Sequence, residues 1–274
     1  SYSGETLDIG TTARPTGLTF NDDGTELVIL GGFATVGADN FHVYSLSTPY
    51  LLTSASYDGR YDASSNLPNT GAGLTFNDDG SKIYTIDFGG GRSVIAFDVS
   101  TAFDVLAGTS HSGEESFLPV RVNPDGFAFG DSGNKLYTTG FNTSDDTVFT
   151  FQLSSAYDLN SAEIIETEAY NTNSEDTRPR DIEFSSDGSK MFVAGQDSNS
   201  VYAYNLSTDW DVSSASYASE NADLSAQIGT GIGTGFTDVH FTSDGLLLFS
   251  LSRIDGDRII HKYELGTAWD LSTI

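Results

Sequence analysis

A phenylalanine followed four residues later by a glycine recurs at five nearly regular intervals along this chain of 274 residues, and this repeat limits the folds that the chain can adopt. The anchors lie at Phe20, Phe76, Phe129, Phe184 and Phe241, with spacings of 56, 53, 55 and 57 residues. Repeats of such length indicate solenoids, propellers or arrays of one supersecondary unit. We therefore expect five copies of one structural unit.

Each unit continues in the same way after its anchor. A polar turn ending in glycine leads into an apolar and aromatic run, a break rich in Gly and Asp, and a second apolar run. Short runs of β-branched and aromatic residues bounded by turn residues predict strands, and Asp-Gly between two such runs predicts a hairpin. A Ser/Thr-rich turn then carries an aromatic residue, at Tyr50, Phe103, Tyr157, Trp210 and Trp269. Each unit is thus predicted to be a meander of four antiparallel strands.

One such sheet cannot bury both of its faces, but five can do so by packing face to face around an axis. We predict an all-β, five-bladed β-propeller with four-stranded antiparallel blades, formed as a single domain by residues 1–274. The last unit ends without a fourth strand, whereas residues 1–10 read like one. The N-terminal strand is therefore predicted to close the last blade. The repeated aromatic residues are interpreted as core.

Two stretches show the repeat most fully: VYAYNLSTDWDVSSAS at 201–216 and IHKYELGTAWDLST at 260–273. With the F-x-x-D-G turns, they resemble a repeat of β-propeller proteins from marine bacteria and tailed phages, which often belong to extracellular or virion-surface proteins. The resemblance covers essentially the whole chain, whereas the WD40, Kelch and NHL signatures are absent. It implies the propeller fold and an extracellular or virion-surface location. The matching residues are the structural ones, so it implies no particular activity.

The charge balance excludes some partners. The chain has 39 Asp and Glu against 12 Lys and Arg, a net charge of −27. Such a surface repels nucleic-acid phosphates and anionic lipid headgroups, so we expect no nucleic-acid or membrane partner. Its acidity fits a saline, marine or extracellular setting. The chain contains no Cys, which excludes disulfides and thiolate metal sites.

The strand that ends at each anchor is expected to line the central channel. At two of its positions, ionisable residues are confined to the last two units. One residue before the anchors stand Thr19, Thr75, Ala128, Glu183 and His240; three before stand Gly17, Gly73, Gly126, Asp181 and Asp238. These two positions share one face of a strand. The candidate ligand-binding residues near the channel mouth are Arg14, Arg178, Arg180, Asp181, Glu183, Asp238 and His240. The alternative is a solvated channel lining or internal ion pairs.

Loops on one face of the predicted propeller vary between units, while the Asp-Gly and Leu-Ser-Thr turns of the other face barely change. The variable loops are 31–40, 87–92, 140–146, 195–200 and 252–258, with the linkers 111–125, 168–180 and 218–236. Function in such scaffolds usually lies on variable loops. We therefore expect binding on that face.

The sequence carries no recognisable catalytic set. The candidate carboxylates come from only two adjacent units, and the chain lacks Gly-x-Ser-x-Gly, His-Glu-x-x-His and phosphate-loop motifs. Asp-rich loops do not match the calcium-binding EF-hand spacing. We expect no enzyme, no metal and no cofactor. The leading hypothesis is an extracellular or virion-surface module that recognises a glycan or a protein; the alternatives are a purely structural decoration domain and a polysaccharide hydrolase or lyase.

Overall fold

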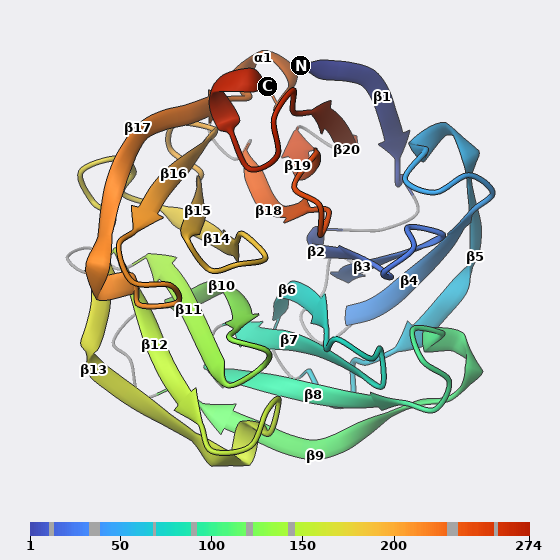
Figure 1. Ribbon diagram of the computed structural model, residues 1–274. Coiled ribbons are helices and arrows are strands. Elements are labelled where there is room, and N and C mark those ends of the chain that lie inside the picture. Colours follow the sequence, from blue (N-terminus) through green and yellow to red (C-terminus); the bar gives the residue numbers. More distant parts are fainter. Residues whose placement is uncertain are drawn as a thin grey trace.

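The computed structural model describes residues 1–10, 14–32, 39–67, 70–88, 92–118, 123–141, 146–228, 235–254 and 257–274. They form five four-stranded antiparallel sheets around a central axis (Figure 1). The prediction of a five-bladed β-propeller with four-stranded blades is confirmed. In the described part of the chain, no helix is long and apolar enough to cross a membrane.

The blades are numbered from the first complete sheet, and each is given from its innermost to its outermost strand. Blade 1 contains β2 (Pro15–Phe20), β3 (Glu26–Gly32), β4 (Asp39–Leu46) and β5 (Ala55–Asp62). Blade 2 contains β6 (Thr70–Phe76), β7 (Lys82–Phe88), β8 (Ser93–Val99) and β9 (Thr109–Phe117). Blade 3 contains β10 (Asn123–Gly130), β11 (Lys135–Phe141), β12 (Thr147–Leu153) and β13 (Ala162–Asn171).

Blade 4 contains β14 (Pro179–Phe184), β15 (Lys190–Gly195), β16 (Ser200–Leu206) and β17 (Ala215–Asp223). Blade 5 contains β18 (Phe236–Phe241), β19 (Leu247–Ile254), β20 (Asp257–Glu264) and β1 (Tyr2–Asp8). One short helix, α1 (Ser225–Ile228), follows β17. A 3-10 turn follows the third strand of every blade, at Leu52–Ser54, Val105–Ala107, Leu159–Ser161, Val212–Ser214 and Leu271–Thr273.

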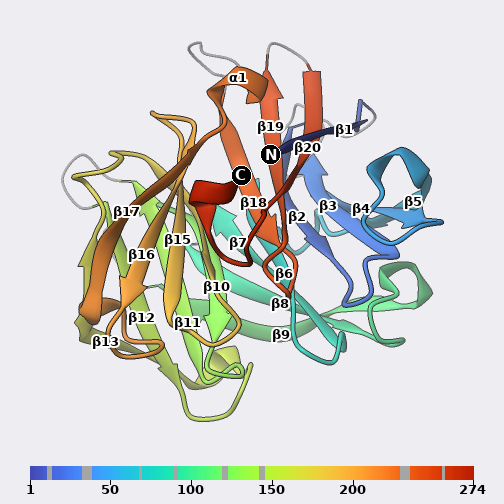
Figure 2. The same ribbon diagram turned by 45° about the horizontal axis from the view of Figure 1, so that its top comes forward.

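The N-terminal strand closes the ring, as predicted. Strand β1 pairs with β20 in the order β1-β20-β19-β18, and both chain ends lie at blade 5 (Figures 1 and 2). The Glu264 amide donates to the Ser1 carbonyl at 2.9 Å, and Lys262 Nζ lies 3.1 Å from Glu5 Oε1. Ile9, just beyond β1, is only 1% exposed. The first and last segments of the chain therefore share one sheet.

The apolar core consists of clusters between neighbouring blades. The described buried residues form five clusters, and each combines side chains from two adjacent sheets. Tyr137 of blade 3, for example, packs with Phe184 of blade 4 at 4.4 Å between ring centroids. Each blade therefore buries its two faces only in the presence of both neighbours, which is why the repeats require a closed ring.

The glycine and the turn aromatic of each repeat are in direct contact. In blade 4, the Trp210 amide donates to the Gly188 carbonyl at 3.0 Å, and a Cβ on Gly188 would lie 2.2 Å from Trp210 Cε2. Trp210 itself has a φ of 63°. The same packing and hydrogen bond recur in the other blades between Gly24 and Tyr50, Gly80 and Phe103, Gly133 and Tyr157, and Gly245 and Trp269. The aromatic ring of the turn thus needs a residue without a Cβ beneath it, which explains why the turn glycine and the turn aromatic recur together.

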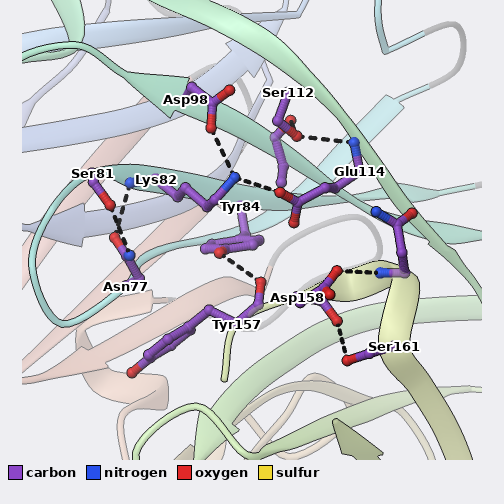
Figure 3. A network of polar contacts seen from close by, with 12 residues as sticks. Asn77, Ser81, Lys82, Tyr84, Asp98, Ser112, Glu114, Tyr157, Asp158 and Ser161 are labelled. Atoms are coloured by element: carbon purple, nitrogen blue, oxygen red, sulfur yellow. Dashed lines mark hydrogen bonds and ion pairs between the residues drawn. The ribbon is translucent and has the colours of Figure 1, made fainter. Parts of the chain in front are cut away.

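Polar contacts near these turns form both within one blade and between neighbouring blades. Figure 3 shows Lys82 Nζ between Asp98 Oδ1 at 2.8 Å and Glu114 Oε1 at 2.6 Å, within blade 2. Nearby, the Tyr84 hydroxyl donates to the Tyr157 carbonyl of blade 3 at 3.0 Å. A buried tyrosine therefore satisfies a carbonyl of the next blade.

Lysine occupies the position of Lys82 in two further blades. Lys135 and Lys190 each donate at 3.0 Å to a turn carbonyl of the next blade, that of Trp210 and that of Trp269. Blade 1 has Glu26 at this position, with Oε1 buried and without a hydrogen-bond partner. Burial, chiefly, raises the pKa of Glu26 to about 7. The joint between blades 1 and 2 thus carries a carboxyl, where the joints between blades 3 and 4 and between blades 4 and 5 carry a lysine.

Candidate functional site

A cavity of about 510 Å³ lies at one mouth of the central channel, among the Asp-Gly turns. Asp22, Asp78 and Asp131 reach it from the turns of blades 1 to 3, and Glu183 and His240 reach it from β14 and β18. Every blade therefore contributes one Asp, Glu or His side chain. None of the described lining residues is Lys or Arg. Burial and the neighbouring Asp78 raise the pKa of Asp22, so the carboxylates crowd one another.

Aromatic rings form the apolar part of the wall. They are Phe20, Tyr50, Phe129, Tyr157, Phe184, Phe241, Trp210 and Trp269. The sequence repeat predicted that these residues belong to the core, and Phe20, Phe184 and Phe241 are buried. Trp210 and Trp269, however, are only half-buried. The structural aromatics of the repeat therefore also line the cavity.

Glu183 and His240 form a pair across the joint between blades 4 and 5. His240 Nδ1 lies 3.5 Å from Glu183 Oε1, and both side chains line the cavity. Each comes from the innermost strand, one residue before its anchor phenylalanine. An imidazole oriented by a carboxylate is an arrangement that can accept a proton from a water or a hydroxyl group. The pair therefore has the chemistry of a general base.

Asp181 and Asp238 lie deeper in the channel and are 3% and 2% exposed. Asp181 Oδ2 accepts the Val239 amide at 3.0 Å, and Asp238 Oδ2 accepts the Leu18 amide at 2.5 Å. Burial raises the pKa of Asp181 to about 7, and burial together with Asp181 raises the pKa of Asp238 well above its ordinary value. Both carboxyls also line a second cavity of about 150 Å³, together with Glu183.

Glycine at the corresponding position of blades 1 to 3 has a packing reason. A Cβ on Gly17 would lie 2.8 Å from the Gly73 carbonyl carbon, and one on Gly126 would lie 2.4 Å from the Asp181 Cα. At these two positions the innermost strands approach to backbone contact and leave no room for a side chain. Gly73 differs, because its φ is 61° and a Cβ there would lie 3.1 Å from the Phe127 ring. The joints on the two sides of blade 5 admit the buried side chains of Asp181 and Asp238.

The three candidate arginines lie apart from these carboxyls. Arg14 is exposed just before β2, and Arg178 lies just before β14, 3.9 Å from Asp197. Arg180 binds the Asp125 carboxylate and donates to Gln196. These arginines belong to the strand ends farthest from the Asp-Gly turns. Of the seven candidates, the structure brings together only the three acidic residues and His240.

The cavity opens on the face opposite to the variable loops. Parts of those loops and linkers lie outside the described residues, namely 33–38, 89–91, 119–122, 142–145, 229–234 and 255–256. Sequence reasoning missed the turn carboxylates Asp22, Asp78 and Asp131 because it interpreted them only as turn formers. A signal was present: two residues after the anchor, units one to three have Asp, whereas units four and five have Ser186 and Ser243. This pattern complements that of Glu183 and His240.

Within the described residues, no group of three or more His, Cys, Asp or Glu side chains is arranged to hold a metal ion.

Comparisons with known proteins find the fold but no family. No family model matches the chain, and no curated protein matches it. A functionally unknown protein from Desulfotomaculum acetoxidans is 13% identical with a TM-score of 0.54, over 94% of this chain and 73% of that one. The Cps50 (Swd1) β-propeller domain of Myceliophteria thermophila is 11% identical with a TM-score of 0.52, over 97% and 99% of the two chains.

A third structure corrects an expectation from the sequence. A proposed 6-phosphogluconolactonase of Bacteroides uniformis is 16% identical with a TM-score of 0.50, over 93% of this chain and 69% of that one. The expectation that the protein is no enzyme is contradicted, because a protein proposed to be a lactonase shares its fold. The expectation rested on missing motifs, and a propeller can assemble a site from strands far apart in sequence. At this identity the likeness shows the fold alone.

Proposed function

We propose that the cavity at the channel mouth is the ligand site and that its ligand is a small neutral sugar. One observation carries this proposal: a concave site of about 510 Å³ receives an ionisable side chain from every blade. Small-molecule sites generally occupy about 300–1,000 Å³. Carboxylates such as Asp78 and Glu183 accept hydrogen bonds from sugar hydroxyls, and the half-buried rings of Trp210 and Trp269 offer apolar surfaces to the sugar ring.

The charge of the cavity argues against a phosphorylated ligand. Four lining carboxylates face the cavity without a Lys or Arg among its described lining residues. Each carboxylate about 4 Å from a phosphate charge costs between about 1 kcal/mol in water and about 4 kcal/mol near a protein surface. A neutral sugar therefore binds this cavity better than its phosphate ester does.

A second candidate function is hydrolysis of a sugar ester or lactone in the same cavity. The Glu183–His240 pair favours it, because His240 held by Glu183 can accept a proton from an attacking water. The water oxygen bonds to the carbonyl carbon as His240 takes the proton. The ring or ester C–O bond then breaks, and His240 returns the proton to the departing oxygen, which gives an acid and an alcohol. The fold shared with a proposed lactonase is consistent with this reaction, but it carries no argument for a particular substrate.

Calorimetric titration with a panel of neutral sugars, aldonolactones and their phosphate esters tests both functions. We expect binding of at least one neutral compound, weaker binding of its phosphate, and loss of binding in Asp78→Asn and Glu183→Gln. Glu166→Gln is the matched control, because Glu166 is exposed on β13, away from the cavity. Lactone turnover that disappears in His240→Gln establishes hydrolysis. No binding by any compound, or equal binding by Asp78→Asn, refutes the proposal for the cavity.

Location and partners are separate proposals. The net charge of −27 and the resemblance to propeller repeats of marine bacteria and tailed phages support an extracellular or virion-surface location. They also support recognition of a glycan or a protein by the variable loops. A glycan array and a pull-down with the intact protein test this recognition, and grafting the Leu-Ser-Thr turns onto a carrier provides the negative control. A purely structural role predicts that the array, the pull-down and the cavity titrations all remain without signal.

A further inference from the structure

The Asp181 and Asp238 carboxyls link the innermost strands on both sides of blade 5. Asp181 of blade 4 accepts the Val239 amide of blade 5, and Asp238 of blade 5 accepts the Leu18 amide of blade 1. The pair thus ties three blades together at the innermost strands. It does so at the joints on both sides of blade 5, the blade that contains both ends of the chain.

The two carboxyls are close enough for one to donate a hydrogen bond to the other, and this contact affects their protonation. A carboxylate has only acceptor oxygens, so a hydrogen bond between two carboxyls requires that one keeps a proton. Asp238 is the donor and Asp181 the acceptor, because burial and the charge of Asp181 favour neutral Asp238. Two ionised carboxyls in contact would repel each other in a buried site.

Among the described residues, no Lys or Arg forms an ion pair with Asp181 or Asp238. Glu183 faces both carboxyls and adds negative charge. Neither β2 nor β6, which both pack against β18, contains a titratable residue, and β10 contributes only Asp125, which binds Arg180. On the other neighbouring strands, Lys135 and Lys190 are engaged with glutamates. His240 is turned to Glu183. Ionisation of both carboxyls therefore leaves an uncompensated charge.

We propose that Asp181 and Asp238 form a proton-dependent clasp that holds blades 4, 5 and 1 together while one carboxyl keeps its proton, and that releases them when both ionise. The clasp forms part of the lining of the channel below the cavity, so its release loosens the channel floor. The closed clasp holds a proton that the open one gives up. The cost of opening therefore falls as the pH rises from the ordinary carboxyl pKa to the raised pKa of the closed pair. Opening becomes about tenfold more frequent per pH unit in this range and levels off above it.

Site-resolved hydrogen exchange by NMR between pH 7 and pH 10 tests the clasp. The amides of Leu18 and Val239 report on it directly, because they donate to the two carboxyls. Rates are divided by the intrinsic rate at each pH to give protection factors. The reference is the Gly71 amide, which donates at 2.7 Å to Asp39, a buried carboxyl across the joint between blades 1 and 2. We expect protection at Leu18 and Val239 to fall steeply at alkaline pH while that at Gly71 stays constant.

Two variants separate the shared proton from the fold. In Asp238→Asn, the side-chain amide can donate to Asp181 and its oxygen can accept from Leu18, at every pH. In Asp181→Asn, the amide can donate to Asp238 in the same way. We expect protection at Leu18 and Val239 to become independent of pH in either variant. Constant protection in the unmodified protein, an equal fall at Gly71, or an unchanged fall in a folded variant would overturn the proposal.

Discussion

Removal of residues 1–10 tests the ring closure most directly. The deletion takes away β1, and with it the edge partner of β20 and several side-chain contacts, three of which can be given a magnitude. Ile9 is 1% exposed, and burial of an isoleucine stabilises by about 1.5–3 kcal/mol. The Tyr2 and Tyr263 rings are 5.6 Å apart between centroids, a contact that contributes about 0.5–1.5 kcal/mol. The Glu5–Lys262 ion pair adds at most about 1 kcal/mol.

Together these contacts amount to about 2–5 kcal/mol. For a chain of this size, each kcal/mol shifts the thermal midpoint by about 2–4 °C, so the deletion should lower the midpoint by roughly 5–20 °C. Differential scanning calorimetry measures the shift. A synthetic peptide of residues 1–10, added in excess, should restore the midpoint by pairing with β20, whereas a scrambled peptide of the same composition should not. A midpoint within a degree of the full chain would refute closure by β1.

Two further changes probe the repeat and the charge of the joints. Gly188→Ala places a Cβ 2.2 Å from Trp210, whereas Gly4, which has a similar φ, has nothing within 4 Å of a Cβ and serves as the control. Chemical denaturation should show Gly188→Ala to be less stable than Gly4→Ala by about 1–3 kcal/mol. Equal losses in the two variants would contradict the packing argument. Because folding raises the pKa of Glu26 from 4.5 to about 7, the folded protein holds a proton that the unfolded chain releases, and stability should fall as pH rises between these values. Glu26→Lys introduces the residue that blades 2 to 4 have at this position, so it should remove this pH dependence and raise the free energy of unfolding at pH 8 by about 1–3 kcal/mol. If the free energies of unfolding at pH 5 and pH 8 differ by as much in the variant as in the unmodified protein, the assignment to Glu26 is refuted.

Much of the fold could be predicted because its signals are local. Each anchor phenylalanine lies next to its own turn, and the Gly188–Trp210 contact recurs in every blade with the same hydrogen bond. The missing fourth strand of the last unit and the strand-like segment at 1–10 predicted that β1 completes blade 5, and this is confirmed. Counting the repeats therefore gave the number of blades without knowledge of any distant contact.

The candidate site could be predicted only in part. The acidic residues Asp181, Glu183 and Asp238 were identified by comparing units, since ionisable side chains replace glycine or small residues there. The comparison did not reveal that the turn carboxylates of the other blades, such as Asp78, complete the same cavity. Nor did it separate Arg178 from the carboxyls, because a few residues along a strand reach from one end of the channel to the other.

The sequence by itself determined the repeating unit, the number of blades and the strand that closes the ring, because these follow from turn chemistry and apolar runs within about 55 residues. Only the tertiary structure decided which mouth of the channel holds the cavity and which two carboxyls share a proton. Asp181 and Asp238 are 57 residues apart in the chain, yet they meet because neighbouring blades place their innermost strands side by side. Their protonation depends on burial and on that contact, and both exist only once the blades have packed around the axis.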